Sequence, residues 1–157
     1  MDARLDVSRS EILRTFTKHL SAAALAVPDS ILPPGTGHLV VIRASQVNGC
    51  SVCTDMHTKD AARAGETPVR LNLVAAWRDA TVFTEAERAA LELAEQGTRI
   101  ADGAGGVTDE AWARAAGQFD DDQLAALVCL IAFIGAYNRV NVICRSPGGG
   151  YRPGQWG

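Results

Sequence analysis

Apolar residues recur at the spacing of an α-helix through most of the chain. After Ser10, the apolar positions Ile12, Leu13, Phe16 and Leu20 fall on one helical face, and the pattern runs toward Ala26. The following segment, 28–37, holds three prolines and two glycines, a composition typical of a loop. The pattern therefore predicts a first helix that ends before a proline-rich connection.

The segment 38–46 is more ambiguous. It is apolar and rich in valine, so that periodicity alone is compatible with a buried strand. We interpret it as a helix, because its surroundings are helical in pattern and no second strand candidate is present to pair with it.

Start and stop signals divide the rest of the chain into further helices. Asn48-Gly49 breaks the chain, Gly65 ends the next element, and Pro68 suits the first turn of another. Thr84 and Glu87 have the spacing of a capping box, while Thr108 can cap a short helix. The three consecutive aspartates at 120–122 favour the start of a last helix, because negative charge stabilises the N-terminal end of the helix dipole. We expect these helices over about 50–64, 68–77, 84–98, 108–116 and 120–145.

The last of these helices is apolar on more than one face. Such a helix is either central in the fold or in contact with another subunit, so we expect a homo-oligomer. A glycine- and proline-rich tail from about residue 146 is expected to be irregular. The whole chain of 157 residues suits one domain, which we predict to be an all-α helical bundle.

Charge and composition exclude several classes of partner. Fifteen Lys and Arg against eighteen Asp and Glu give a net charge of −3, without a basic stripe, so nucleic acid is not expected to bind. No apolar stretch of the signal-peptide type follows Met1, and the apolar run 124–136 is shorter than a typical membrane span. We therefore expect a cytoplasmic protein that does not enter a membrane, and we assign no cofactor-binding or metal-binding residue.

Two of the four cysteines are close together in sequence. In a reducing compartment such a pair is catalytic or metal-binding more often than structural. On one helix, Cys50, Cys53 and His57 would fall within an arc of about 60°. An imidazole one turn from a thiol can accept its proton, and the second thiol can close a disulfide after oxidation. This arrangement suits reduction of peroxides by a thiolate, followed by restoration of the pair by an external dithiol.

Alternative interpretations of the cysteines remain open. Cys50, Cys53, His57 and His38 could together supply four zinc ligands, although no second Cys-x-x-Cys motif is present. A thioredoxin-like fold would require a strand before the motif. Cys129 and Cys144 lie in the apolar last helix, and we expect both to be small buried hydrophobic residues.

Several stretches resemble a known family. Residues 43–60, RASQVNGCSVCTDMHTKD, resemble the signature of the AhpD-like alkylhydroperoxidases in the carboxymuconolactone decarboxylase superfamily. Residues 64–67, 75–78 and 137–142 are similar to later parts of the same proteins, and the resemblance covers roughly residues 12–145.

The resemblance implies an all-α fold that assembles into trimers or hexamers and reduces hydroperoxides. Carried onto this chain, it makes Cys53 the cysteine that attacks the peroxide, Cys50 the resolving cysteine and His57 the proton partner. The implied reductant is a dithiol, for which the resemblance suggests a lipoyl protein. A decarboxylase acting on a carboxylated lactone is the alternative within the same superfamily.

The chain departs from the family pattern at two positions. Many members have a relay glutamate twelve residues before the first cysteine, where this chain has His38, and some have histidine where it has Val52. His38 could act as the base through a water molecule, since imidazole titrates near neutral pH. It could equally be a neutral hydrogen-bonding residue near a helix start.

Overall fold

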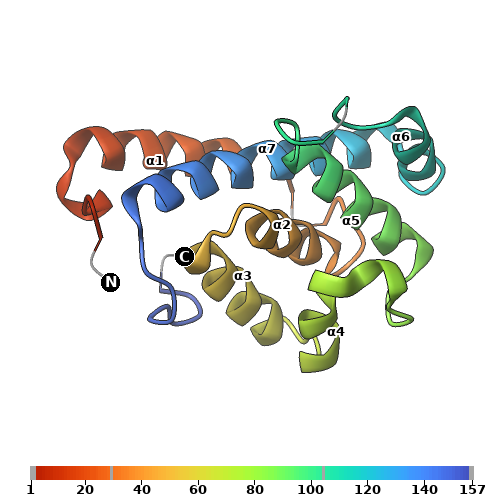
Figure 1. The fold of residues 1–157 in the computed structure, drawn as a ribbon, viewed down its shortest axis with the longest axis horizontal. Helices are drawn as coiled ribbons and strands as arrows, with labels where there is room; N and C mark the ends of the chain where they lie inside the picture. Colours follow the sequence, from red (N-terminus) through yellow and green to blue (C-terminus); the bar gives the residue numbers. More distant parts are fainter. Residues whose placement is uncertain (1–2, 29, 104, 156–157) are drawn as a thin grey trace.

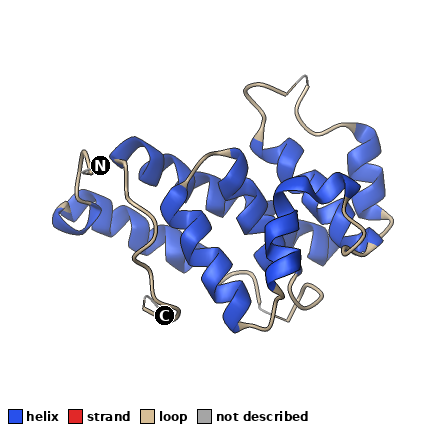
Figure 2. Ribbon diagram, turned by 60° about the horizontal axis from the view of Figure 1, so that its bottom comes forward, coloured by secondary structure: helices blue, strands red, loops and turns tan. Residues whose placement is uncertain are grey.

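The computed structural model describes residues 3–28, 30–103 and 105–155. Within these residues all regular structure is helical and no strand is present (Figure 2). This arrangement confirms the predicted all-α fold.

The first three α-helices follow the predicted pattern closely. A short 3₁₀ turn, η1 (Val7–Arg9), leads to α1 (Glu11–Ala24), where the Ser10 hydroxyl accepts the Leu13 N–H. The ambiguous segment lies within helix α2 (Thr36–Val47), which confirms its helical interpretation. Helix α3 (Ser51–Arg63) follows after three intervening residues, and the chain leaves it at Gly65, whose φ is 104°.

The predicted helix from Pro68 to Trp77 is interrupted. It divides into α4 (Pro68–Leu73) and a 3₁₀ segment, η2 (Val74–Asp79), with non-helical backbone at Ala76. Trp77 is buried and its indole N–H donates to Glu95, 2.9 Å away. Tertiary burial of this tryptophan thus outweighs local helix propensity.

The later helices begin where their capping residues predicted. Thr84 and Glu87 form a reciprocal capping box at the start of α5 (Glu85–Thr98). Thr108 caps α6 (Asp109–Ala116), and Asp120 forms a second capping box with Gln123 at the start of α7 (Asp121–Cys144). These bonds satisfy backbone N–H groups that the first helical turn leaves without partners.

Helix α2 is the centre of the molecule. It packs against α3, α5 and α7, and α7 extends further along α1 (Figure 1). The buried apolar side chains of α2 belong to three clusters: Leu39 and Ile42 pack with Leu91 of α5, Val40 with Leu127 of α7, and Val41 with Ile134 of α7. The helix that carries the candidate site, α3, is therefore held between α2 and the C-terminal part of α7.

The apolar run 124–136 was too short to predict a membrane span, but it lies within helix α7, which is longer. It has 24 residues and is long and apolar enough to cross a membrane by length and composition, and 22% of its most apolar window is buried. It packs against five other elements, α1, α2, α3, α5 and α6, as the core helix of a helical domain does. Its exposed apolar side chains include Val128, Val142 and Ile143.

The C-terminal tail contains no helix or strand in residues 146–155, yet it is anchored to α3. Asp55 accepts the backbone N–H groups of Gly149 and Tyr151, while Lys59 donates to the carbonyl oxygens of the same two residues. The Tyr151 hydroxyl donates to Asp60. The tail therefore lies over the outer face of α3 and close to its first turn.

Candidate active site

The candidate site is built on the break between α2 and α3. Gly49 adopts a left-handed conformation, with φ of 65°, that directs the chain from the end of α2 toward the start of α3. Cys50 follows in an extended conformation as the N-cap of α3, and its backbone N–H donates to the Ser45 carbonyl at 2.9 Å. Cys50 is thus placed by the turn and not by a helix.

This placement corrects one expectation from the sequence. Cys50, expected at the start of the helix with its sulfur on the same face as Cys53 and His57, is the residue before α3. The reason is local, because its sulfur accepts the N–H of Cys53 at 3.3 Å and so caps the helix. Helical spacing relates only Cys53 and His57, which lie one turn apart on α3.

The two cysteines form a disulfide. Their Sγ atoms are bonded and their Cα atoms lie 5.4 Å apart. Both residues are buried, with exposed fractions of 1% for Cys50 and 3% for Cys53. The structure therefore brings together the two thiols that the sequence singled out, in the oxidised form of the pair.

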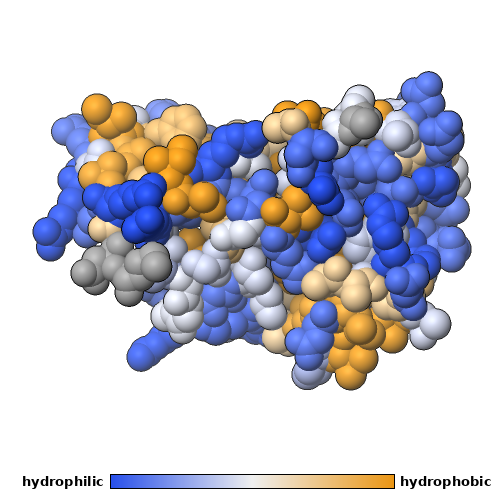
Figure 3. Space-filling view, in the orientation of Figure 1, coloured by the Kyte–Doolittle hydropathy of each residue, from blue (hydrophilic) through white to orange (hydrophobic). Residues whose placement is uncertain are grey.

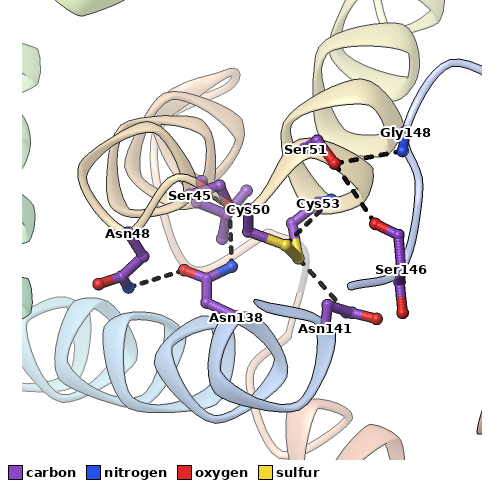
Figure 4. The surroundings of a disulfide bond; sticks show 10 residues. Ser45, Asn48, Cys50, Ser51, Cys53, Asn138, Asn141, Ser146 and Gly148 are labelled. Carbon is purple, nitrogen blue, oxygen red and sulfur yellow. Dashed lines mark hydrogen bonds between the residues drawn. A yellow bond between two sulfur atoms is a disulfide. The ribbon is translucent and has the colours of Figure 1, made fainter. Parts of the chain in front are cut away.

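Helix α7 contributes two asparagines to the same place (Figure 4). The Asn141 amide donates to the Cys53 sulfur at 3.5 Å. Asn138 is fully buried, accepts the Asn48 amide and donates to the Ser45 hydroxyl, so that it fixes the turn before Cys50. Sequence reasoning did not assign a site role to either residue; the available signal was two amide side chains in the apolar C-terminal part of the last helix.

His57 presents an unpartnered nitrogen. The residue as a whole is half-buried, but its Nε2 atom is enclosed and has no hydrogen-bond partner among the described residues. Burial lowers the pKa of His57 to about 4; the Asp60 carboxylate acts in the opposite direction, and positive charge on His38 lowers the pKa further. The imidazole is therefore neutral at neutral pH in this oxidised form, and the same burial makes it a weaker base than a free imidazole.

His38 lies on α2, near enough for its charge to affect His57. The structure thus brings the two histidines into one electrostatic environment. No hydrogen bond within the described part of the chain joins either imidazole to a sulfur atom. Their proposed proton-transfer roles require the reduced thiols, which the disulfide form does not present.

A surface cavity opens beside the disulfide. It has a volume of about 400 Å³ and lies between the start of α3, the end of α7 and the tail. Cys50 is part of its wall and Cys53 is not. The lining consists of Gly49, Cys50, Ser51, Asn141, Val142, Arg145, Ser146, Pro147 and Gly148.

Other candidate residues have structural partners or lie elsewhere. Among the described residues, no group of three or more His, Cys, Asp or Glu side chains is arranged to hold a metal ion, so the four residues weighed as zinc ligands do not form such a site. Cys144 is buried as expected, but the expectation for Cys129 is wrong, because α7 turns it toward the surface of the single chain.

Arg43, a charged residue within the family-like stretch, forms an internal ion pair. Its guanidinium donates to Glu95 at 2.7 and 3.0 Å. Burial raises the pKa of Glu95, but hydrogen bonds from Trp77 and Arg43 outweigh it and the net shift is downward. Arg43 thus helps to hold α2 against α5.

Comparison with known proteins identifies a matching family and a protein of similar sequence. Residues 10–96 match the model of the carboxymuconolactone decarboxylase family. The uncharacterized protein YdfG of Bacillus subtilis is 40% identical over 107 residues, which are 68% of this chain and 71% of YdfG.

Solved structures share the fold. A protein of unknown function from Agrobacterium tumefaciens, suggested to be the antioxidant defence protein AhpD, has 31% identity and a TM-score of 0.86, with 96% of this chain and all of that chain covered. The debrominase Bmp8 has 19% identity and a TM-score of 0.76, with 92% of this chain and 75% of its own covered. The likeness to the debrominase concerns the fold alone.

Proposed function

We propose that this chain, which belongs to the carboxymuconolactone decarboxylase family, is a thiol-dependent peroxidase that reduces hydroperoxides through Cys53 and Cys50. One observation carries the proposal. The Cys53 sulfur is bonded to Cys50 and accepts a hydrogen bond from Asn141, and Cys53 lies one helical turn before His57, whose Nε2 has no hydrogen-bond partner among the described residues.

The first step is attack by Cys53. In the reduced enzyme, neutral His57 accepts the proton of the Cys53 thiol, and the thiolate attacks one oxygen of the hydroperoxide. The O–O bond breaks, the alcohol leaves with a proton, and Cys53 becomes a sulfenic acid. The Asn141 amide stabilises the negative charge on sulfur before the attack.

Cys50 completes the oxidation. Its thiol attacks the sulfenic sulfur of Cys53, water leaves, and the disulfide forms. The N-cap geometry already places the two sulfurs within bonding distance, so the step needs no large rearrangement of the backbone. Rapid capture protects Cys53 from further oxidation.

An external dithiol, of which a lipoyl protein is one candidate, then reduces the disulfide. Because Cys50 lines the surface cavity and Cys53 does not, we place the attack of the reductant at Cys50, with Cys53 as the leaving thiolate.

Sulfenic acid trapping tests the assignment of the two cysteines. The start of α3 favours a thiolate at Cys50, which opposes the assignment, whereas Asn141 and His57 favour Cys53. Under one equivalent of hydroperoxide, we expect a dimedone adduct in Cys50→Ser and none in Cys53→Ser. An adduct confined to Cys53→Ser would reverse the roles.

His38 is proposed as an additional base that acts through a water molecule and takes the proton from His57. His38→Ala should lower the rate of peroxide reduction and change its pH profile. An unchanged rate and profile would leave His38 with only a structural role.

We further propose that the protein assembles into a homo-oligomer through apolar surface left open on the single chain. Figure 3 shows apolar side chains over α1 and the adjoining end of α7, where Ile12, Phe16 and Ile143 are exposed. Light scattering of the purified protein should give a trimer or hexamer, and a monomeric mass at micromolar concentration would contradict the proposal.

A further inference from the structure

We propose that Arg145 is an anion-binding residue that positions the dithiol reductant beside Cys50, and that this reductant carries a negative charge. The inference rests on the proposed function, because it concerns the reductive step of the same site. It goes further by assigning a specificity-determining residue and the charge class of the reductant.

The cavity beside the disulfide supplies the setting. Its volume of about 400 Å³ lies within the range of small-molecule sites. Arg145 is the one charged residue in its lining, and Cys50, one of the two residues of the disulfide, is part of the same wall. The remaining lining residues are glycines, serines, Asn141, Val142 and Pro147. A molecule in this cavity therefore lies beside both a cation and a residue of the disulfide.

The guanidinium of Arg145 has no counter-ion in the described part of the chain. Its side chain is exposed, and no hydrogen bond or ion pair from it to another described residue is present. Most other arginines near the core have carboxylate partners, as Arg43 and Arg70 do. The charge of Arg145 is thus available to a ligand.

The backbone of Arg145 is unusual. Its φ of 54° and ψ of 46° place it in the left-handed region, and it is the one non-glycine residue with positive φ among those described. Glycine or asparagine is the usual residue at this position after a helix. A residue held in an unfavourable conformation beside a reactive group is a reason to look for a function of its side chain.

Backbone hydrogen bonds fix this conformation. The N–H of Arg145 donates to the Val142 carbonyl at 3.3 Å, and that of Ser146 donates to the Asn141 carbonyl at 2.9 Å. The turn that presents Arg145 is therefore continuous with the helical turn that presents Asn141 to Cys53. The cation and the leaving sulfur are held by the same end of α7.

The proposed reduction of the disulfide proceeds in two exchange steps. A thiolate of the reductant attacks the Cys50 sulfur, the Cys50–Cys53 bond breaks, and Cys53 leaves with the electron pair as a thiolate. The second thiol of the reductant then loses its proton and attacks its partner sulfur in the mixed disulfide. Cys50 is released as a thiolate, the reductant leaves as a disulfide, and the two protons of the dithiol balance the two cysteine thiolates.

The charge of the whole protein makes the inference testable. A net charge of −3 repels anions from the surface in general. A preference for an anionic reductant must therefore come from a local cation. An alternative role for Arg145 is purely structural, because a cation at the end of α7 is favoured by the helix dipole.

Dihydrolipoate and dihydrolipoamide form a matched pair of probes, since they share one dithiol and differ in a carboxylate or a neutral amide at the far end. The rate of reduction of the Cys50–Cys53 disulfide in the full chain would be followed by quenching with an alkylating agent and mass spectrometry. At low salt we expect dihydrolipoate to react about fivefold faster, and added salt should reduce the ratio.

Variants distinguish an anion-binding role of Arg145 from a purely structural role. Arg145→Gly should bring the ratio to about one, whereas Arg145→Lys should keep most of the preference. Arg114→Gln removes one positive charge from α6, at the opposite end of the molecule (Figure 1), and should keep the ratio. Equal rates for the two reductants in the natural protein, or an unchanged ratio in Arg145→Gly, would overturn the proposal.

No hydroperoxide is present in this experiment. If the protein reduces peroxide but shows no preference for dihydrolipoate over dihydrolipoamide, the result counts against the role of Arg145 alone. If it shows the preference but does not reduce peroxide, the result counts against the proposed function alone.

Discussion

The Asn141 side chain of α7 donates its amide N–H to the Cys53 sulfur at 3.5 Å, across 88 residues of sequence. This contact joins the helix that carries the reactive cysteine to the helix that runs the length of the molecule. The amide is a neutral donor, so it stabilises a thiolate without adding a permanent charge.

Replacement of Asn141 by leucine should therefore reduce the reactivity of Cys53. Loss of a hydrogen bond to a charged group should lower the thiolate population and slow alkylation of Cys53 about tenfold at neutral pH. The measurement is iodoacetamide labelling in the Cys50→Ser background, as a function of pH. Asn141→Gln, which keeps an amide, is the matched control, and equal labelling rates in Asn141→Leu and the parent would contradict the role of the contact.

Stability should depend on pH through His57. The unfolded chain protonates this imidazole near pH 6.5, while burial lowers its pKa in the folded protein to about 4. Between these values protons bind the unfolded chain preferentially, so stability is retained above pH 6.5 and is lost as the pH falls toward 4. The loss attributable to His57 is at most about 3 kcal/mol.

Urea denaturation of the oxidised protein at several pH values measures this effect. His57→Asn should show a shallower loss of unfolding free energy between pH 6.5 and 4. His19→Asn, which changes an exposed imidazole on α1, should follow the natural protein. If the unfolding free energies of the natural protein and His57→Asn changed with pH in parallel, the pH dependence of stability would not arise from His57.

The tail should limit access to the disulfide. A Cβ added at Gly148 would lie 2.6 Å from the Ser51 carbonyl oxygen, so Gly148→Ala must displace the tail from the start of α3. We expect the disulfide of this variant to react severalfold faster with dithiothreitol. Gly150→Ala is the control, because nothing lies within 4 Å of its added Cβ. Slower or unchanged reduction in Gly148→Ala would exclude a shielding role.

Arg145→Gly should stabilise the fold. Glycine adopts the left-handed conformation without the steric cost that arginine carries there, so we expect a gain of about 1 kcal/mol in the free energy of unfolding. Chemical denaturation of both proteins in the oxidised form measures it. Destabilisation would instead indicate that the arginine side chain contributes to the fold.

The sequence predicted the helices well because their signals are local. Capping at Thr84 and Asp120 depends on residues three positions away, and those helices begin as expected. The ambiguous segment 38–46 required the context of its neighbours, because buried helices and buried strands have similar composition. The break at Ala76 depends on burial of Trp77, which no local pattern contains.

The site was also predictable only in part, because some of its contacts depend on tertiary packing that local sequence patterns do not contain. The pairing of Cys50 with Cys53 follows from short spacing, but the N-cap position of Cys50 depends on the turn at Gly49. Asn141 and Arg145 reach the site through the packing of α7 on α3, over more than 80 residues. Long-range contacts of this kind leave no periodic signal in the sequence.

Steady-state peroxide turnover with dihydrolipoamide as reductant tests the central claim most directly. The natural protein should consume the hydroperoxide with stoichiometric oxidation of the dithiol, and both Cys53→Ser and Cys50→Ser should fall to the rate without enzyme. Full turnover by Cys53→Ser, or none by the natural protein in its oligomeric, fully reduced form, would contradict a Cys50–Cys53 peroxidase.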